Sequence, residues 1–369
     1  MPGDDRDLSF TAVGDLMLGD SAKCVGFGVR SATSRSGFGY LFQKICNFLE
    51  GDIVFANLEC VVGDHDFCRW SFRKAQMRGA PGAVTALREA GITVLNVANN
   101  HAMQHGEVGF RATCRAIEEA GLHVVGLRGT GRYLCHPLVL DLRGKKVGIL
   151  GYGCTTENYC RNTPLYAQGH PPQIIADTAM LSEECDKVVV SLHWGDEFVS
   201  GPSAEIVDLG RKVIDAGACL VVGHHPHVLQ EAEAYRDGII LYSLGNFVSD
   251  MLWDDPLRKG IIVTCDVGAT TQIRKTVLVE TCDDYSVAPL AVAEHYPVSH
   301  CSRVPAEYES YVERLRLRNR NLSHLHVAKN FHRYNPAILA QIAFQSLRSA
   351  LHLQDASPGR RSVRHYPHP

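Results

Sequence analysis

Residues Val221–His227 read VVGHHPH, an apolar run followed by three histidines within four residues. A short, continuous apolar run is typical of a strand that is buried on both faces, as in the parallel sheet of an α/β protein. The usual alternative for a histidine tract is a surface cluster. Because this tract directly follows an apolar strand, the sequence predicts a strand that presents imidazole groups at its carboxyl end.

The same arrangement recurs at four earlier places in the chain. The predicted strand 8–13 is followed by Asp15, and the predicted strand 53–56 by Asn57 and Glu59. The predicted strand 93–98 is followed by Asn100 and His101, and the predicted strand 188–192 by His193. In α/β sheets the ligand crevice lies at the carboxyl ends of the strands, so these side chains converge if the strands are neighbours. Carboxylate and amide oxygens suit hard divalent cations, and imidazole suits Zn, Mn, Fe or Co. The mixture predicts two divalent ions about 4 Å apart, which can lower the pKa of a water towards neutrality.

Each of these residues has a plainer interpretation when it is taken alone. Asp15 could form a turn or cap a helix, and Asn99–Asn100 could be a simple turn pair. A single His193 is more often a hydrogen-bonded core residue than a ligand. The joint occurrence at strand ends is therefore what favours a metal site. Asp52 is excluded, because it precedes its strand and should lie more than ~20 Å from Glu59.

The remaining pattern predicts an α/β fold with a helical C-terminal extension. Helices are expected at 40–49, 82–90, 106–120, 174–185 and 203–216, and further strands at 123–126, 139–142, 146–150, 239–243, 261–267 and 275–280. The last two look like adjacent antiparallel strands. The chain becomes helical and highly charged from Pro305, with an amphipathic helix at 336–353. We therefore predict a domain at 8–300, a helical extension at 301–355 and a disordered tail at 356–369.

Composition excludes several classes of protein. The 369 residues carry a formal net charge of −3, which gives no basic bias towards nucleic acid. No run of about 18 apolar residues predicts a membrane span, and the N-terminus does not resemble a secretory signal. The 13 cysteines are odd in number and form no Cys-x-x-Cys pair. This disfavours a disulfide framework and predicts a reducing, cytoplasmic location. The oligomeric state stays open.

Six short stretches together resemble the CapA family, which is named for capsule and poly-γ-glutamate biosynthesis. They are Gly14–Gly19, Phe55–Glu59, Ala98–Ala102, Ser191–Gly195, Val222–His227 and Tyr242–Phe247. The resemblance covers about residues 8–250, in order. It implies a four-layer α-β-β-α sandwich similar to the calcineurin-like metallophosphoesterases. Two departures from the phosphoesterase pattern are Met17, where a histidine ligand is usual, and Asn57–Glu59, which replaces the usual Gly-Asp segment.

The resemblance also implies roles for individual residues. The metal ligands would be Asp15, Glu59, Asn100, His193 and the final histidine cluster, where the His-x-His pattern favours His225 and His227 over His224. His101, next to a ligand, would protonate the leaving group. Arg78, in a loop that looks like the family's Arg-Pro loop, would bind a carboxylate or phosphate of the substrate. The alternative for Arg78 is a solvated loop residue.

The expected function is that of a metal-dependent hydrolase. It would act on a γ-glutamyl-type amide bond or a phosphoester bond of an anionic small molecule or polyglutamate. The identity of the metal, whether Mn, Zn, Fe or Mg, is left open. One alternative is a non-catalytic accessory protein that binds polyglutamate for a biosynthetic machine. Another is an enzyme that forms or transfers amides in a small-molecule pathway.

Overall fold

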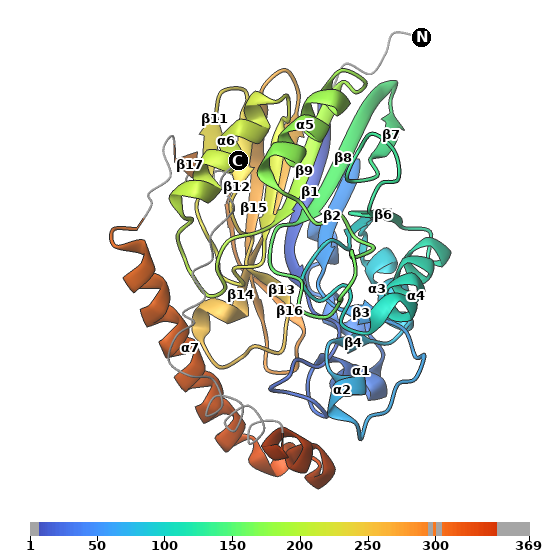
Figure 1. Cartoon of the computed structure of the whole chain (residues 1–369), viewed down its shortest axis with the longest axis vertical. Coiled ribbons are helices and arrows are strands. Elements are labelled where there is room, and N and C mark those ends of the chain that lie inside the picture. The colour runs from blue at the N-terminus through green and yellow to red at the C-terminus, as the bar shows by residue number, and fades with distance from the viewer. Residues whose placement is uncertain (1–6, 294–297, 300–304, 345–369) are drawn as a thin grey trace.

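Two β-sheets packed face to face form the centre of the molecule (Figure 1). The structure is a computed structural model that describes residues 7–293, 298–299 and 305–344. The first sheet runs in the order β16 (Val287–Ala293), β15 (Thr271–Thr281), β14 (Lys259–Val267), β1 (Leu8–Leu16), β2 (Ile53–Leu58), β5 (Val94–Asn96) and β6 (His123–Val125), with β13 (Asn246–Val248) beside β1. The second runs in the order β17 (Val298–Ser299), β11 (Ala232–Tyr235), β12 (Gly238–Leu241), β10 (Leu220–His224), β9 (Lys187–His193), β8 (Lys145–Gly153) and β7 (Leu138–Leu142).

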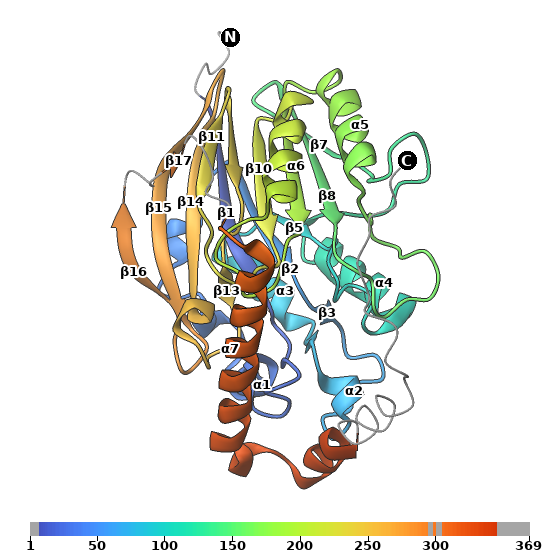
Figure 2. The same cartoon turned by 60° about the vertical axis from the view of Figure 1, so that its left-hand side comes forward.

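Helices cover the outer face of each sheet. The helices α3 (Gly82–Ala90) and α4 (Gly106–Glu119) lie on the first sheet, and α5 (Pro171–Ser182) and α6 (Ala204–Asp215) lie on the second (Figures 1 and 2). All four lie where the sequence predicts helices, with ends that differ by at most a few residues. Ser203 caps α6 by accepting a hydrogen bond from the Ile206 amide, which satisfies one of the free donors of the first turn.

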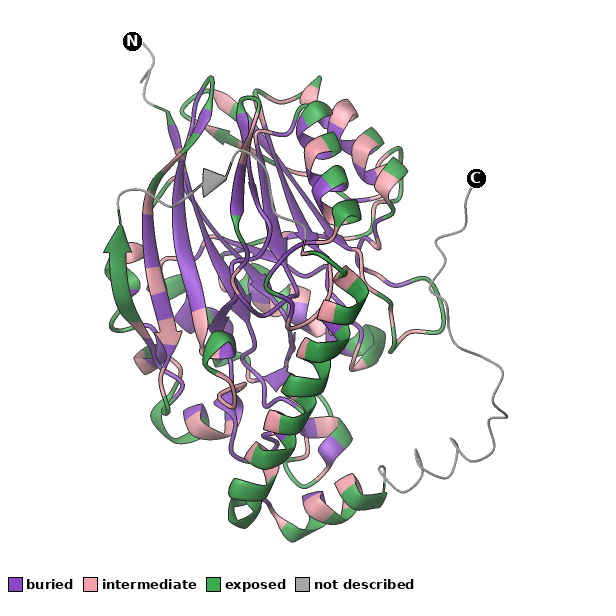
Figure 3. Ribbon diagram, turned by 90° about the vertical axis from the view of Figure 1, so that its left-hand side faces the viewer, coloured by how far each residue is buried: buried purple, intermediate pink, exposed green. Residues whose placement is uncertain are grey.

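The central strands are apolar because they are buried on both faces. In β2, Ile53 and Phe55 face the opposite sheet, whereas Val54 and Ala56 face the helices. In β10, Leu220 and Val222 likewise face the first sheet. The apolar side chains thus form three layers, one between the sheets and one beneath each helical layer. Figure 3 shows the strands of both sheets as mostly buried. The predicted four-layer α-β-β-α sandwich is confirmed.

The segment 40–49 is not the helix that we predicted. It forms two short 3₁₀ turns, Gly39–Leu41 and Cys46–Phe48, in which most amides bond to the carbonyl three residues earlier. Apolar residues at spacings of three and four fit a 3₁₀ turn as well as an α-helix over so short a stretch. Conversely, α1 (Val29–Ser36) lies in the preceding segment, where we predicted no helix. Its Ser and Thr content weakens the helical signal.

Short elements join the strand ends of the first sheet. They are the helix α2 (Phe72–Ala75) and the paired strands β3 (Val61–Val62) and β4 (Arg78–Gly79), in a stretch where we predicted no helix or strand. At the opposite end of β2, Asp52 accepts a hydrogen bond from the Ser9 amide at 2.7 Å and pairs with Arg143 at 2.5 Å. Its exclusion from the metal cluster is consistent with these contacts.

The C-terminal part of the described chain is helical. The long helix α7 (Tyr308–Lys329) confirms the charged helix expected after Pro305, and a second helix occupies 336–344. The rest of the helix predicted at 336–353, the proposed boundary at 300 and the tail 356–369 lie outside the described residues. None of the described helices combines the length and the apolar character needed to cross a bilayer. The described cysteines are free thiols.

Candidate metal centre

The register of the strands places one row of polar residues across the first sheet. Asp15 lies opposite Asn57 on one side and Asn246 on the other, and Asn57 lies opposite Asn96. In the second sheet, His193 lies opposite His224. Since side chains at one register position of a sheet share a face, the two rows meet between the carboxyl ends of the sheets. The predicted convergence of distant segments is therefore present.

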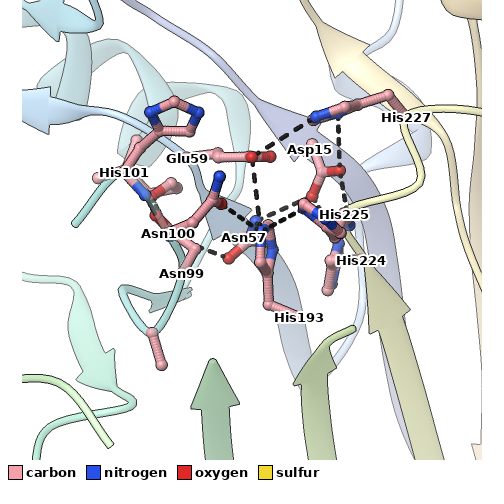
Figure 4. A network of polar contacts seen from close by, with 12 residues as sticks. Asp15, Asn57, Glu59, Asn99, Asn100, His101, His193, His224, His225 and His227 are labelled. Atoms are coloured by element: carbon pink, nitrogen blue, oxygen red, sulfur yellow. Dashed lines mark hydrogen bonds and ion pairs between the residues drawn. The ribbon is translucent and has the colours of Figure 1, made fainter. Parts of the chain in front are cut away.

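Asp15 links the two sheets at this point (Figure 4). Its Oδ1 accepts a hydrogen bond from Asn57 Nδ2 at 2.9 Å and lies 3.0 Å from His224 Nδ1. Its Oδ2 accepts from the His225 amide at 3.2 Å and lies 3.4 Å from His227 Nδ1. Burial opposes ionisation of Asp15, but His224 and His227 outweigh it and hold the pKa of the carboxyl well below its usual range. Asp15 is thus anionic at neutral pH.

Several atoms that could coordinate a metal ion lie around Nε2 of His193. Asn100 Oδ1 lies 2.8 Å from it, His225 Nδ1 3.1 Å and Glu59 Oε1 3.5 Å. Burial lowers the pKa of both histidines, that of His225 to about 3, so both rings are neutral with lone pairs available. Ligands that share a cation at about 2.1 Å lie about 3 Å from one another. The spacing therefore fits a set of metal ligands.

Glu59 belongs to two groups of candidate ligands. One group is Asp15, Glu59 and His193, and the other is Glu59, His225 and His227, with all ligand atoms of each group within 4.8 Å of one another. The carboxylate is fully buried, and within the described part of the chain neither of its oxygens has a hydrogen-bond partner. A buried carboxylate without such partners is costly unless something else compensates it. A divalent cation is the compensation that this set of ligands fits.

The pKa values of Glu59 and His227 are both raised. Burial raises the pKa of Glu59 well above its usual range, with the charges of Asp15 and Glu197 adding to this. Burial opposes protonation of His227, but Glu59 and Asp15 outweigh it and raise its pKa to about 10. The metal-free centre therefore holds protons that a cation must displace.

The turn after β10 places two of the histidines. His225 and His227 have positive φ angles of 98° and 60°, a backbone conformation that is costly for residues other than glycine. Such strain is found at functional sites, where the surrounding structure holds the backbone in place. Just before the turn, Gly223 packs so closely that a Cβ atom would lie 2.1 Å from the Tyr242 carbonyl oxygen. Glycine is therefore required there.

We expect Gly223→Ala to destabilise the fold by at least about 1–3 kcal/mol, the usual cost of overpacking. The added methyl group would meet backbone and the Trp194 ring, neither of which can move freely. Urea denaturation measures the change in unfolding free energy. Gly82→Ala is the matched control, because a Cβ at Gly82 meets nothing within 4 Å. Equal stability of the two variants would show that the packing around Gly223 is wrongly described.

His101 and Arg78, the two predicted catalytic residues, lie at different distances from this cluster. His101 lies at the edge of the network drawn in Figure 4, and its Nδ1 donates to Gln104 Oε1 at 2.6 Å. Burial lowers the pKa of His101 to about 4. Arg78 is buried rather than solvated and donates to the carbonyl of His65. Among the described residues, no direct contact joins Arg78 to the predicted metal ligands.

Sequence reasoning did not predict that Asn57 and Asn246 orient the ligands. Asn57 Nδ2 contacts Asp15 and, at 3.3 Å, Nδ1 of His193. Asn246 Oδ1 lies 3.1 Å from Nδ1 of His227, which directs Nε2 towards Glu59. Both asparagines were visible at strand ends, but only the register across the sheet shows which ligand each one contacts. Met17 packs into the core beneath the helices, so it contributes nothing to the centre.

A two-sheet sandwich with carboxylate, amide and imidazole groups at its strand ends defines an α/β protein with a candidate metal centre. The family described as bacterial capsule synthesis protein PGA_cap matches residues 9–251. The chain belongs to this family, which confirms the resemblance seen in the sequence motifs.

Two relatives carry names that fit the family. The capsule biosynthesis protein CapA of Bacillus anthracis is 33% identical over 265 residues, which span 68% of this chain and 62% of the relative. The PGA biosynthesis protein CapA of Bacillus subtilis (strain 168) is 32% identical over 257 residues, 68% and 65% of the two chains. The match thus spans less than two thirds of either relative. A solved 5'-nucleotidase from Candida albicans SC5314 aligns with a TM-score of 0.42 at 10% identity, over 88% of this chain and 58% of that one.

Proposed function

We propose that this protein is a metal-dependent hydrolase that cleaves a γ-glutamyl-type amide bond in an anionic substrate. The observation that carries the proposal is Glu59, a buried carboxylate without hydrogen-bond partners in the described chain, which is shared by two groups of candidate ligands. A single carboxylate between two such groups is the arrangement of a two-metal hydrolase.

Six side chains would hold the ions. The first position takes Asp15 and His193 with Asn100, the second takes His225 and His227, and Glu59 contributes to both. When bound, divalent cations polarise the scissile group and lower the pKa of a water towards neutrality. Other residues of the protein orient these ligands. Asn57 contacts Asp15, and Asn246 contacts His227. Such outer contacts commonly tune metal affinity.

His101 is proposed as the residue that handles the proton of the leaving group. With a pKa of about 4, it is neutral at pH 7 in the metal-free molecule, and its Nε2 accepts because Nδ1 donates to Gln104. To act as an acid it must take up a proton as the anionic substrate binds, since a nearby negative charge raises the pKa of an imidazole. Its place next to Asn100 suits that transfer.

The substrate class rests on the relatives. The names of the two Bacillus relatives refer to capsule and PGA biosynthesis, and the family is named for capsule synthesis. We therefore place the γ-glutamyl amide first and a phosphoester second, because the fold is also that of phosphoesterases and fold alone does not select the chemistry. Arg78 as an anion anchor stays a prediction. The pKa of its guanidinium is lowered by burial and by Arg30, so a bound anion would be favourable there.

We expect His101→Gln to lower turnover by about 10²–10⁴-fold while the metal content stays unchanged. The assay combines metal analysis of purified protein with hydrolysis of γ-linked glutamyl peptides and a panel of phosphoesters. Asn100→Ala is the comparison, because it removes a proposed ligand and should lower metal content as well. If His101→Gln loses its metal, the residue is a ligand rather than a proton carrier.

A second candidate is a non-catalytic role in polymer synthesis. A relative in Mycobacterium tuberculosis, 26% identical over 215 residues, is named a probable polyglutamine synthesis accessory protein. In that case neither the His101 nor the Asn100 variant would change polymer production in cells. Loss of production in both variants would favour the hydrolase.

A further inference from the structure

The helix α7 lies outside the part of the chain that matches the family, yet it packs beside the metal centre. The match ends at residue 251, whereas α7 begins at Tyr308. Figure 2 shows α7 running along the outside of the sandwich, in front of its strands. An element outside the matched region but next to the candidate site is a natural place for substrate selection, because specificity is usually set by segments around a shared scaffold.

Three side chains of α7 bind the loop that follows His193. Asp196 accepts from Arg316 Nη2 at 2.5 Å and from Tyr308 OH at 3.1 Å. Four residues after Asp196, Ser200 Oγ lies 2.5 Å from Tyr311 OH. The first half of α7 is therefore fixed to the short loop that follows His193, a proposed metal ligand.

That loop also contacts the other histidine segment. The Phe198 amide donates to the Pro226 carbonyl at 2.8 Å, and the Phe198 ring lies 6.0 Å from the ring of His227. The loop thus lies between α7 and the turn that carries the last two ligands. Arg316 Nη2 lies 2.5 Å from Asp196, the third residue after His193, so its guanidinium lies beside this loop.

Arg316 has the properties of an anion-binding residue. Its side chain is 49% exposed, and a single hydrogen bond, to Asp196, engages it within the described residues. A guanidinium has five N–H donors in a planar fork, so four stay available for a carboxylate. The ion pair with Asp196 holds the fork in place and reduces the entropy lost on binding.

We propose that Arg316, held by Asp196, binds a carboxylate of the substrate beside the bond that is cleaved. This inference rests on the proposed function. A γ-linked glutamate chain carries a free α-carboxylate on every residue, so a carboxylate neighbours each amide bond. Arg316 would then select a polyanionic chain over an uncharged amide and would act through substrate binding, without taking part in bond cleavage.

The test compares two peptides on the full-length protein. Titration calorimetry measures the affinity of γ-linked triglutamate and of the same peptide with its α-carboxylates amidated. We expect Arg316→Gln to weaken binding of triglutamate about tenfold and to leave the amidated peptide unchanged. Arg316→Lys should recover part of the loss by keeping the charge. Arg314→Gln is the control, because two residues along an α-helix point in nearly opposite directions and Arg314 is exposed.

Three outcomes would overturn this inference. They are equal weakening of both peptides, equal effects of Arg316→Gln and Arg314→Gln, and no binding of triglutamate by the unmodified protein. Metal content and hydrolysis are measured on the same preparations. Retained metal and turnover without discrimination between the peptides would leave the hydrolase standing and remove the role of Arg316. Binding that depends on Arg316 in a protein that takes up no metal would support the role of Arg316 and contradict the proposed hydrolase.

Discussion

Replacing Glu59 with glutamine is expected to remove both of the proposed divalent ions together. The carboxylate is common to both groups of ligands, and a neutral amide cannot supply its charge. Changing an outer contact of a metal ligand already costs about 10–100-fold in affinity, so loss of a shared direct ligand should cost more than about 100-fold. Equilibrium dialysis followed by metal analysis measures the loss. Hydrolysis should fall with it.

Ligands that belong to only one of the two groups provide the comparison. Asp15→Asn should weaken one ion and His227→Gln the other, so only the Glu59 variant loses both. The stabilisation of the fold by bound metal should depend on Glu59 in the same way. At a metal concentration of 100 times Kd, the unmodified protein gains about 2.7 kcal/mol of unfolding free energy, and the Glu59 variant should gain almost none. Loss of one ion alone in Glu59→Gln would mean that the carboxylate serves a single metal position.

Metal affinity should rise steeply with pH, because loading the centre displaces protons. His227, with a pKa of about 10, is protonated at pH 7, and Glu59 has a raised pKa as well. His193 and His225, whose pKa values are lowered, are already neutral and release none. Each displaced proton makes the apparent affinity rise tenfold per pH unit below the pKa of its group. At least one proton, and thus about a thousandfold gain from pH 6 to 9, is expected.

Calorimetry in buffers of different ionisation enthalpy counts the released protons directly. In His227→Gln the count should fall by about one, with the remaining ion still bound. A count of zero in the unmodified protein would show that His227 is neutral before the metal binds. It would also show that the carboxylates around it are compensated in some other way.

Much of the site could be predicted because strand ends are visible in the sequence. The apolar runs before Asp15, Glu59 and His193 mark strands that are buried on both faces, and the polar residue that ends each run must then lie at the carboxyl edge. Helices such as α3 were equally clear, since their apolar spacing is regular and a glycine follows the last turn. Local periodicity failed at 40–49, where the same spacing fits 3₁₀ turns.

By itself, the sequence determined the alternation of strands and helices in this protein and the set of chemical groups at its strand ends. Both follow from local patterns of apolar and polar residues. The tertiary structure alone decided which groups meet, because a contact such as that of Asn57 with His193 joins two sheets and depends on register. It also decided that Glu59 is shared, that Arg78 is buried and that α7 packs beside the centre. Such contacts join residues far apart in the chain, so no local pattern of the sequence predicts them.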